Sequence, residues 1–236
     1  PPRSTLFPYT TLFRSASGAS FISRVSPVIN FVFVIIAAII LPVMFLKPII
    51  SFQGDIILFA YILGTARFFQ IMGAMDIGSS FEGMGAAREA LFALFAEPIF
   101  FFSFGSIAFI SGYYSFYDVF TNIKLDSVYY IIFIVICSIS VFMLAVTECS
   151  RMPIDDPNTH LELTMIHEVM ILDNSGFDLF LYQYGSYIKL LVYTILEISL
   201  FYPFGSFSPV LQTVIFLGGF VFLSAFLALI ETITSR

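Results

Sequence analysis

The stretch Val128–Glu148, VYYIIFIVICSISVFMLAVTE, decides the fold class of this chain, because it carries no charged residue before its last. A helix needs about 20 mainly apolar residues to cross the roughly 30 Å hydrocarbon core of a bilayer. The stretch does not alternate with a period of two, so it predicts a membrane-spanning helix and not a strand of an outer-membrane barrel. Five further stretches are similar in length and composition, which predicts an all-α integral membrane bundle of about six transmembrane helices. These stretches are Ser26–Leu46, Ile56–Met75, Leu91–Gly112, Ser186–Phe207 and Pro209–Ile230.

The composition supports this fold class and excludes several kinds of soluble protein. Of the 236 residues, 59% are hydrophobic and 11% are charged, and the mean hydropathy is +0.97; soluble domains carry about 25% charged residues. Ten Lys and Arg against sixteen Asp and Glu give a net charge of −6, without the basic cluster that nucleic-acid binding requires. The two cysteines, Cys137 and Cys149, are too few for a disulfide framework, and we expect inert structural thiols.

The first fifteen residues are set apart from the rest of the chain. Thr5–Ser15, TLFPYTTLFRS, matches the conceptual translation of a common short-read sequencing adapter. We therefore exclude Pro1–Ser15 from fold reasoning, as one would a fusion scar. Residues 16–236 are expected to form a single integral membrane domain, truncated at both ends.

The basic residues predict the orientation, because cytoplasmic loops carry an excess of Lys and Arg. Arg67 lies within a predicted span and is left out of the count. Over alternate loops, five basic residues lie on one side and two on the other. This predicts that the Ala16 end and the loops at 76–90 and 149–185 are cytoplasmic, in a protein of the inner (cytoplasmic) membrane. The two sets are Arg24, Arg88, Arg151, Lys189 and Arg236 against Lys47 and Lys124.

Titratable residues are concentrated between positions 148 and 178, which hold seven of the sixteen acidic residues and both histidines. Within this stretch Thr159 and Glu162 form a capping box. We therefore predict a cytoplasmic amphipathic loop helix over His160–Leu172. At 100° per residue, His160 and His167 lie on one face of it. The acids are Glu148, Asp155, Asp156, Glu162, Glu168, Asp173 and Asp178.

Three interpretations of this polar stripe stay open. It is part of a proton-handling or redox-coupled cavity, a solvated helix at the membrane surface, or a metal site. The metal hypothesis is the weakest, because His167-Glu168 lacks the second histidine of an HExxH site. We predict no metal in this chain.

Charged residues within the predicted spans form a second group of candidates. A charge at the centre of a membrane helix costs roughly 2.5–3.5 kcal/mol on insertion scales and is a functional hypothesis by default. Arg67, Glu97 and Glu197 are such residues, and Glu148 ends its span. The alternative is a purely structural ion pair, for example between Arg67 and Glu97.

A resemblance to a known family rests on two stretches, Asp76–Pro98 (DIGSSFEGMGAAREALFALFAEP) and Glu148–Gly176 (ECSRMPIDDPNTHLELTMIHEVMILDNSG). Both are similar to the membrane subunit shared by respiratory complex I, where it is subunit 1, and the energy-converting group 4 nickel–iron hydrogenases, which include formate hydrogenlyase. The quinone-reducing branch typically reads Asn-Arg-Ala-Pro-Phe-Asp and then a Glu-rich stretch. This chain reads SRMPIDDP at 150–157 and THLELTM at 159–165, so it resembles the hydrogenase branch.

This resemblance implies a helical subunit that binds no cofactor and has no catalytic residue of its own. It would dock a peripheral redox arm on its cytoplasmic loops and couple electron transfer there to H⁺ or Na⁺ translocation. The implied partners are hydrogenase-like large and small subunits, an Fe–S subunit and antiporter-like membrane subunits. The parent complex would carry Fe–S clusters and a nickel–iron centre. Because the family has about eight spans, one span is expected to be missing at each end.

The residues to which these arguments assign a role form two sets. The first set, for proton coupling, is Glu97, Glu148, Asp155, Asp156, Glu162, Glu168 and, from its place in a span, Glu197. The second set, their charge partners, is Arg67, Arg88, Arg151, His160 and His167.

Three alternatives remain at this point. One is the quinone-binding membrane subunit of NADH–quinone oxidoreductase (complex I), which shares the fold. Another is a stand-alone secondary transporter with Arg67, Glu97 and Glu197 as its substrate site, although the absence of an inverted repeat counts against it. The last is a structural anchor.

Overall fold

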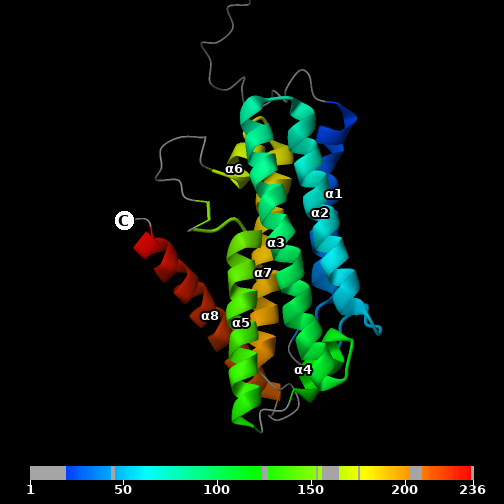
Figure 1. The fold of residues 1–236 in the computed structure, drawn as a ribbon, viewed down its shortest axis with the longest axis vertical. Coiled ribbons are helices and arrows are strands. Elements are labelled where there is room, and N and C mark those ends of the chain that lie inside the picture. Colours follow the sequence, from blue (N-terminus) through cyan, green and yellow to red (C-terminus); the bar gives the residue numbers. More distant parts are fainter. Residues whose placement is uncertain are drawn as a thin grey trace, which may run out of the picture.

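A computed structural model describes residues 20–43, 46–123, 127–152, 154–155, 165–174, 176–201 and 209–234. These residues form eight helices, drawn in Figure 1, and the predicted all-α fold is confirmed. The helices are α1 (Phe21–Ile40), α2 (Asp55–Ile77), α3 (Ser80–Ser111), α4 (Phe116–Asn122), α5 (Val128–Glu148), α6 (His167–Met170), α7 (Phe177–Phe201) and α8 (Pro209–Thr234).

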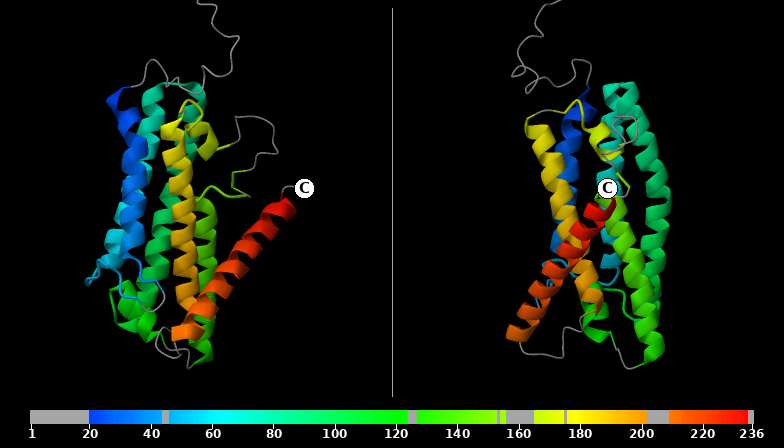
Figure 2. Two further views of the ribbon diagram at one scale, coloured as in Figure 1. Left: turned by 180° about the vertical axis from the view of Figure 1, so that it is seen from behind. Right: turned by 90° about the vertical axis from the view of Figure 1, so that its left-hand side faces the viewer.

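Five of the long helices pack into a closed ring. α1 packs on α2 and α7, α3 packs on α2 and α5, and α5 closes the ring against α7. α8 contacts mainly α7. It slants away from the ring toward its C-terminal end (Figure 2). Within the described part of the chain, six helices are long and apolar enough to span a membrane, as predicted.

The boundaries of the spans agree with the prediction at α5 and differ most at α3. α5 runs over Val128–Glu148 as predicted, but α3 begins at Ser80, so the predicted loop at 76–90 is helical apart from Gly78 and Ser79. Gly78 adopts φ 75° and ends α2, with its N–H donated to the carbonyl of Met75, and the chain reverses within two residues. At 1.5 Å per residue the 32 residues of α3 span about 48 Å, longer than the hydrocarbon core.

The end of the bundle that holds α4 is a packed aromatic core. Phe59, Phe104, Phe116 and Phe120 are almost fully buried, and the rings of Phe59 and Phe116 lie 5.3 Å apart. Buried Asp55, at the start of α2, accepts hydrogen bonds from the Phe116 N–H at 2.9 Å and from the Ser115 hydroxyl at 2.8 Å. This carboxylate therefore fixes the start of α4, a helix that the hydrophobic pattern did not predict.

The predicted loop helix over His160–Leu172 is confirmed only over His167–Met170 in its described part. Met165 and Ile166 are not helical, and only His167–Met170 forms a helix, α6. The start of α6 is fixed by a residue far away in the sequence. The Asp155 carboxylate accepts hydrogen bonds from the backbone N–H groups of Ile166 at 2.9 Å and His167 at 3.0 Å. The predicted cap, Thr159, lies outside the described residues.

α7 begins at Phe177, nine residues before the predicted span. Lys189 therefore lies well inside the helix, where its side chain is buried. Because this charge is buried in the bundle, the charge count that predicts the orientation loses one of its five residues.

Candidate functional site

Four charged side chains from four helices meet inside the ring, and we call them the charged quartet: Arg67 of α2, Glu89 of α3, Glu148 of α5 and Lys189 of α7. The Arg67 guanidinium pairs with the Glu148 carboxylate, and its Nε lies 3.4 Å from Glu89 Oε1. Lys189 Nζ lies 3.5 Å from Glu148 Oε2 and donates to the Glu148 carbonyl at 3.3 Å. All four side chains are at most 10% exposed. The quartet links α2, α3, α5 and α7 at one level of the bundle.

The quartet is electrically balanced and strongly interdependent. Two carboxylates face two cations, which offsets the cost of removing each charge from water. Arg67 Nε and Glu148 Oε2 have only these longer ionic contacts and no hydrogen-bond partner within the described part of the chain. The two carboxylates share the same two cations. A proton added to one carboxylate changes the balance at the other three members.

Cys149, which follows Glu148 of the quartet, has a thiol of low reactivity. Burial raises the pKa of its thiol to about 12, against a smaller opposing effect of the Lys189 and Arg151 charges. The reactive thiolate is therefore scarce at neutral pH, and the prediction of an inert thiol is supported at this position.

A chain of hydrogen bonds runs from α6 to α1 beside the quartet. Gln70 Nε2 lies 2.8 Å from His167 Nδ1, and Asn30 Nδ2 donates to Gln70 Oε1 at 3.0 Å. Because the Gln70 oxygen accepts from Asn30, the Gln70 nitrogen is the donor to Nδ1, which leaves the imidazole proton on Nε2. Burial lowers the pKa of His167 to about 4, and the Lys189 charge acts in the same direction. His167 is therefore neutral at pH 7.

The loop that carries α6 is held against α3 by a close approach. A Cβ on Gly85 would lie 2.9 Å from the Ile166 carbonyl oxygen, so only glycine allows this contact. Arg88 Nη1 donates to the Met165 carbonyl at 3.4 Å, and Glu82 Oε1 accepts the Asp173 N–H at 3.1 Å. Together with Asp155, these groups place His167 beside the end of the quartet.

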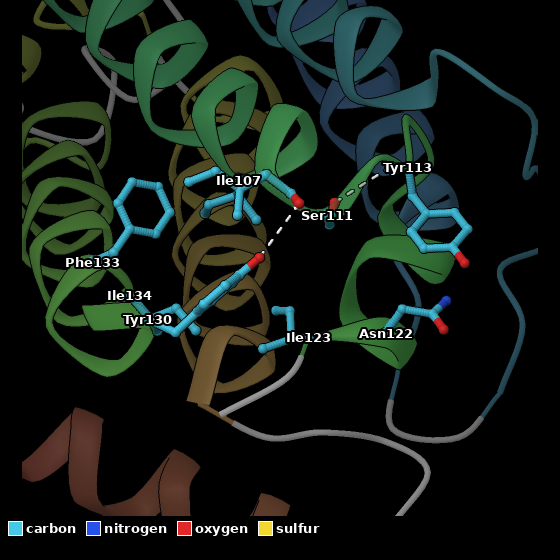
Figure 3. Close-up of a pocket in the computed structure, with 9 residues that line it drawn as sticks. Ile107, Ser111, Tyr113, Asn122, Ile123, Tyr130, Phe133 and Ile134 are labelled. Atoms are coloured by element: carbon cyan, nitrogen blue, oxygen red, sulfur yellow. Dashed lines mark hydrogen bonds between the residues drawn. The ribbon is translucent and has the colours of Figure 1, made fainter. Parts of the chain in front are cut away.

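A cavity of about 260 Å³ lies at the opposite end of the bundle, between α3, α4 and α5 (Figure 3). Tyr130 and Ser111 bring hydroxyl groups to it, and the Tyr130 hydroxyl donates to the Ile110 carbonyl at 3.4 Å. The described residues that line it include no carboxylate and no base. Among its described lining residues, this cavity therefore offers no carboxylate or base that could take up a proton.

Comparison with known proteins shows the family of this chain. The model of the NADH dehydrogenase family matches residues 12–236. The chain belongs to this family. It is 27% identical over 210 residues to hydrogenase-4 component C of Escherichia coli (strain K12), covering 85% of this chain and 62% of the relative. It is 27% identical over 201 residues to formate hydrogenlyase subunit 4 of the same strain, covering 80% and 60%.

The chain thus spans about three fifths of the length of these two relatives. The predicted resemblance to this family is confirmed, and both relatives have hydrogenase-type names.

The structure brings together about half of the predicted site residues. Arg67 and Glu148 belong to the quartet, and Asp155, His167 and Arg88 order the loop beside it. Glu168 is exposed and lines a cavity with Arg151 at the loop side. Asp156, His160 and Glu162 lie outside the described residues.

Glu97 does not lie where the prediction put it. It is exposed on the outer face of α2 and α3, next to Gly64, and its partner is not Arg67. The predicted Arg67–Glu97 pair is therefore wrong, and Glu89 takes its place. The reason is helical phase, because eight residues at 100° each turn Glu97 about 80° away from Glu89.

Two members of the quartet, Glu89 and Lys189, were missed as site residues. Lys189 was counted with the adjoining loop because it is only the fourth residue of its predicted span, Ser186–Phe207. Glu89 was left in the loop before the third span. A helix that begins at Ser80 puts Glu82 and Glu89 seven residues apart on one face, and this spacing was the signal available in the sequence.

Proposed function

We propose that this chain is a hydrogenase-type membrane subunit that couples electron transfer in a peripheral arm to H⁺ (or Na⁺) translocation. The observation that carries the proposal is the charged quartet, a balanced set of four buried charges inside the membrane bundle. Buried ionisable groups in membrane helices are costly and mark ion pathways. The family membership and the hydrogenase-type relatives support a subunit of a respiratory-type complex.

The loop of Asp155 and α6 provides the coupling between the arm and the quartet. Asp155 holds the N-terminus of α6, and α6 holds His167 at the hydrogen-bonded chain beside the quartet. A unit charge that appears about 10 Å away changes the energy of a carboxylate by about 1.7 kcal/mol at an effective dielectric constant of 20. A change of charge in a docked arm can therefore move protons within the quartet without a large motion of the helices.

The partners and cofactors follow from the same proposal. The large, small and Fe–S subunits of the arm would dock on the loop end, on the cytoplasmic side, and antiporter-like subunits would lie beside the bundle. The nickel–iron centre and the Fe–S clusters are assigned to the arm. In the described part of this chain no three His, Cys, Asp or Glu side chains come together in a way that could hold a metal.

The direct test is the substitution Glu148→Gln in the complete complex, expressed with its neighbouring subunits. Proton translocation, followed in vesicles by the quenching of a ΔpH-sensitive dye, should be lost while the complex still assembles. Asp118→Asn is the matched control, because Asp118 lies in α4 at the far end of the bundle. Normal translocation by Glu148→Gln would overturn the proposal. Glu97→Gln tests separately whether the exposed carboxylate contributes.

A quinone-reducing complex is the second candidate, because the matching family model is that of NADH dehydrogenase. Nickel content and viologen-driven hydrogen evolution of the purified complex separate the two. Nickel together with hydrogen supports the hydrogenase type. Quinone reduction without nickel supports the other.

A further inference from the structure

A carboxylate faces outward from the helix ring near the middle of α3. Glu97 lies about 26 Å along the helix from Ser80 and about 21 Å from Ser111. The residue is exposed, and in the described part of the chain it has no ion-pair or hydrogen-bond partner. A charged group in a transmembrane helix is costly, and such residues almost always face protein or water and not lipid. Glu97 therefore needs a partner from outside the described residues.

The carboxylate lies in a hollow that has the shape of a helix-packing site. α2 and α3 lie side by side (Figure 1), and the hollow of about 190 Å³ lies on the surface between them. A Cβ on Gly64 would lie 3.2 Å from Glu97 Oε1, so the glycine lets the carboxylate lie close to α2. Ala60 and Gly64 line the hollow one turn apart. Small residues at this spacing allow another membrane helix to approach closely.

The groups around the hollow suit a cation. Pro98 lies inside α3 and has no N–H, so the carbonyl of Leu94 lacks its usual helical donor. Leu94 is 68% exposed, on a side only about 60° from Glu97. The faces of aromatic rings also attract a cation. Three aromatic residues line the same hollow: Tyr61, Phe68 and Phe101.

Lipid and a second copy of this chain fit the hollow poorly. The hydrocarbon core of a bilayer offers no hydrogen-bond donor to a carboxylate. A two-fold dimer centred on the hollow would place Glu97 against the same residue of the second copy, and like charges in contact oppose association. The complementary occupant is a helix that brings a positive charge.

We propose that the α2–α3 face around Glu97 docks a transmembrane helix of a neighbouring membrane subunit, whose lysine or arginine pairs with Glu97 midway through the bilayer. The small residues Ala60 and Gly64 contribute because close approach of the helices keeps lipid away from the two charges. This inference rests on the proposed function for the presence of neighbouring membrane subunits, and it gives one of them a site on this chain.

Photocrosslinking in the complete complex tests the occupant. A benzophenone amino acid replaces Phe68 in the hollow, and mass spectrometry identifies the peptide that it captures when intact membranes are illuminated. We expect a peptide from a transmembrane helix of another subunit that contains a lysine or arginine. The control position is Phe95, which is 61% exposed and turned about 160° from Glu97 on α3, and it should not capture that peptide. The proposal is overturned if no other subunit is captured, whether the product contains lipid, a second copy or another segment of this chain.

The charge is tested by how much of the captured subunit is retained when the complex is purified through a tag on this chain. Glu97→Lys should lower retention at least tenfold, because it sets two cations against each other. Phe95→Lys is the matched control, since it adds the same charge within about 3 Å of the same depth but outside the hollow, and retention should not change. Replacing the lysine or arginine of the captured helix by glutamate should restore retention in Glu97→Lys. Equal retention for Glu97→Lys and wild type would overturn the ion pair.

The shape of the hollow is tested without a change of charge, which also covers the case in which Glu97→Lys does not fold. Gly64→Leu places a side chain in the hollow, so retention should fall about tenfold through overpacking. Gly105→Leu is the control on α3, because no atom lies within 4 Å of a Cβ added there. Normal retention in Gly64→Leu would overturn the docking face. Retention needs no turnover, so it can fall as expected even where the Glu148→Gln test of the proposed function fails.

Discussion

The two sides of α7 hold charge in different ways. On one side the quartet joins four helices through side chains that are at most 10% exposed, and each charge depends on the others. On the other side Arg151 and Glu231 form one partly exposed pair between a loop and the slanting α8. A buried network leaves unpaired charges behind when one member is removed, whereas an exposed pair returns its members to water. The quartet should therefore support the fold, and the pair should be free to open.

The largest expected effect comes from removing the central cation of the quartet. Arg67→Met leaves Glu89 and Glu148 buried with Lys189 as their nearest cation, and breaking a buried pair costs about 3–5 kcal/mol. We expect a large loss of thermal stability of the purified complex in detergent. Arg151→Met is the control on the other side of α7, with an expected change under about 1 kcal/mol. Equal losses for the two variants would show that the two sides are not different.

A change of pH should act on the quartet side through His167. Burial lowers the pKa of this imidazole to about 4 from 6.5, so between these values the unfolded chain holds a proton that the folded chain does not. The stability from neutral His167 is complete above pH 6.5 and is lost as the pH falls toward 4, by at most about 1.4 kcal/mol per pH unit. Thermal unfolding of wild type and His167→Gln, compared over this range, checks it. Parallel pH profiles would contradict a buried neutral histidine.

The close contact between α3 and the loop that carries α6 gives the next test. Gly85→Ala brings a Cβ to within 2.9 Å of the Ile166 carbonyl oxygen, a backbone atom, and overpacking of this kind costs about 1–3 kcal/mol. The measurement is thermal stability together with proteolysis of the loop. Gly83→Ala is the matched control on the same helix, because no atom lies within 4 Å of its added Cβ. In a helix that substitution should be neutral or stabilising by up to about 1 kcal/mol.

The sequence predicted the spans well and the quartet only in part. The reason is that spans depend on local sequence, whereas the quartet depends on contacts between distant helices. Twenty apolar residues in a row predict a helix locally, so α5 was placed to the residue. The start of α3 depends on a two-residue reversal at Gly78 and Ser79, and the polar residues after it look like a loop until the packing against α6 is known. With that start misplaced, Glu97 was favoured over Glu89.

The loop shows the same dependence on tertiary contacts. Thr159 and Glu162 are a good local capping signal, but α6 begins at His167 because Asp155, twelve residues earlier in the chain, accepts its N–H groups. A cap that lies twelve residues before the helix leaves no recognisable pattern in the sequence around the start of the helix. Lys189 was counted with the loop because it lies near the start of its predicted span, whereas α7 begins at Phe177 and buries it.

The smallest expected effect lies on the α8 side. Glu231→Gln removes one member of the partly exposed pair, so the unfolding free energy should change by less than about 1 kcal/mol. The check is the thermal stability of the purified complex in detergent, measured beside that of Arg67→Met. A large loss of stability would place Glu231 with the quartet as a structural charge, and α8 would then be a fixed part of the bundle.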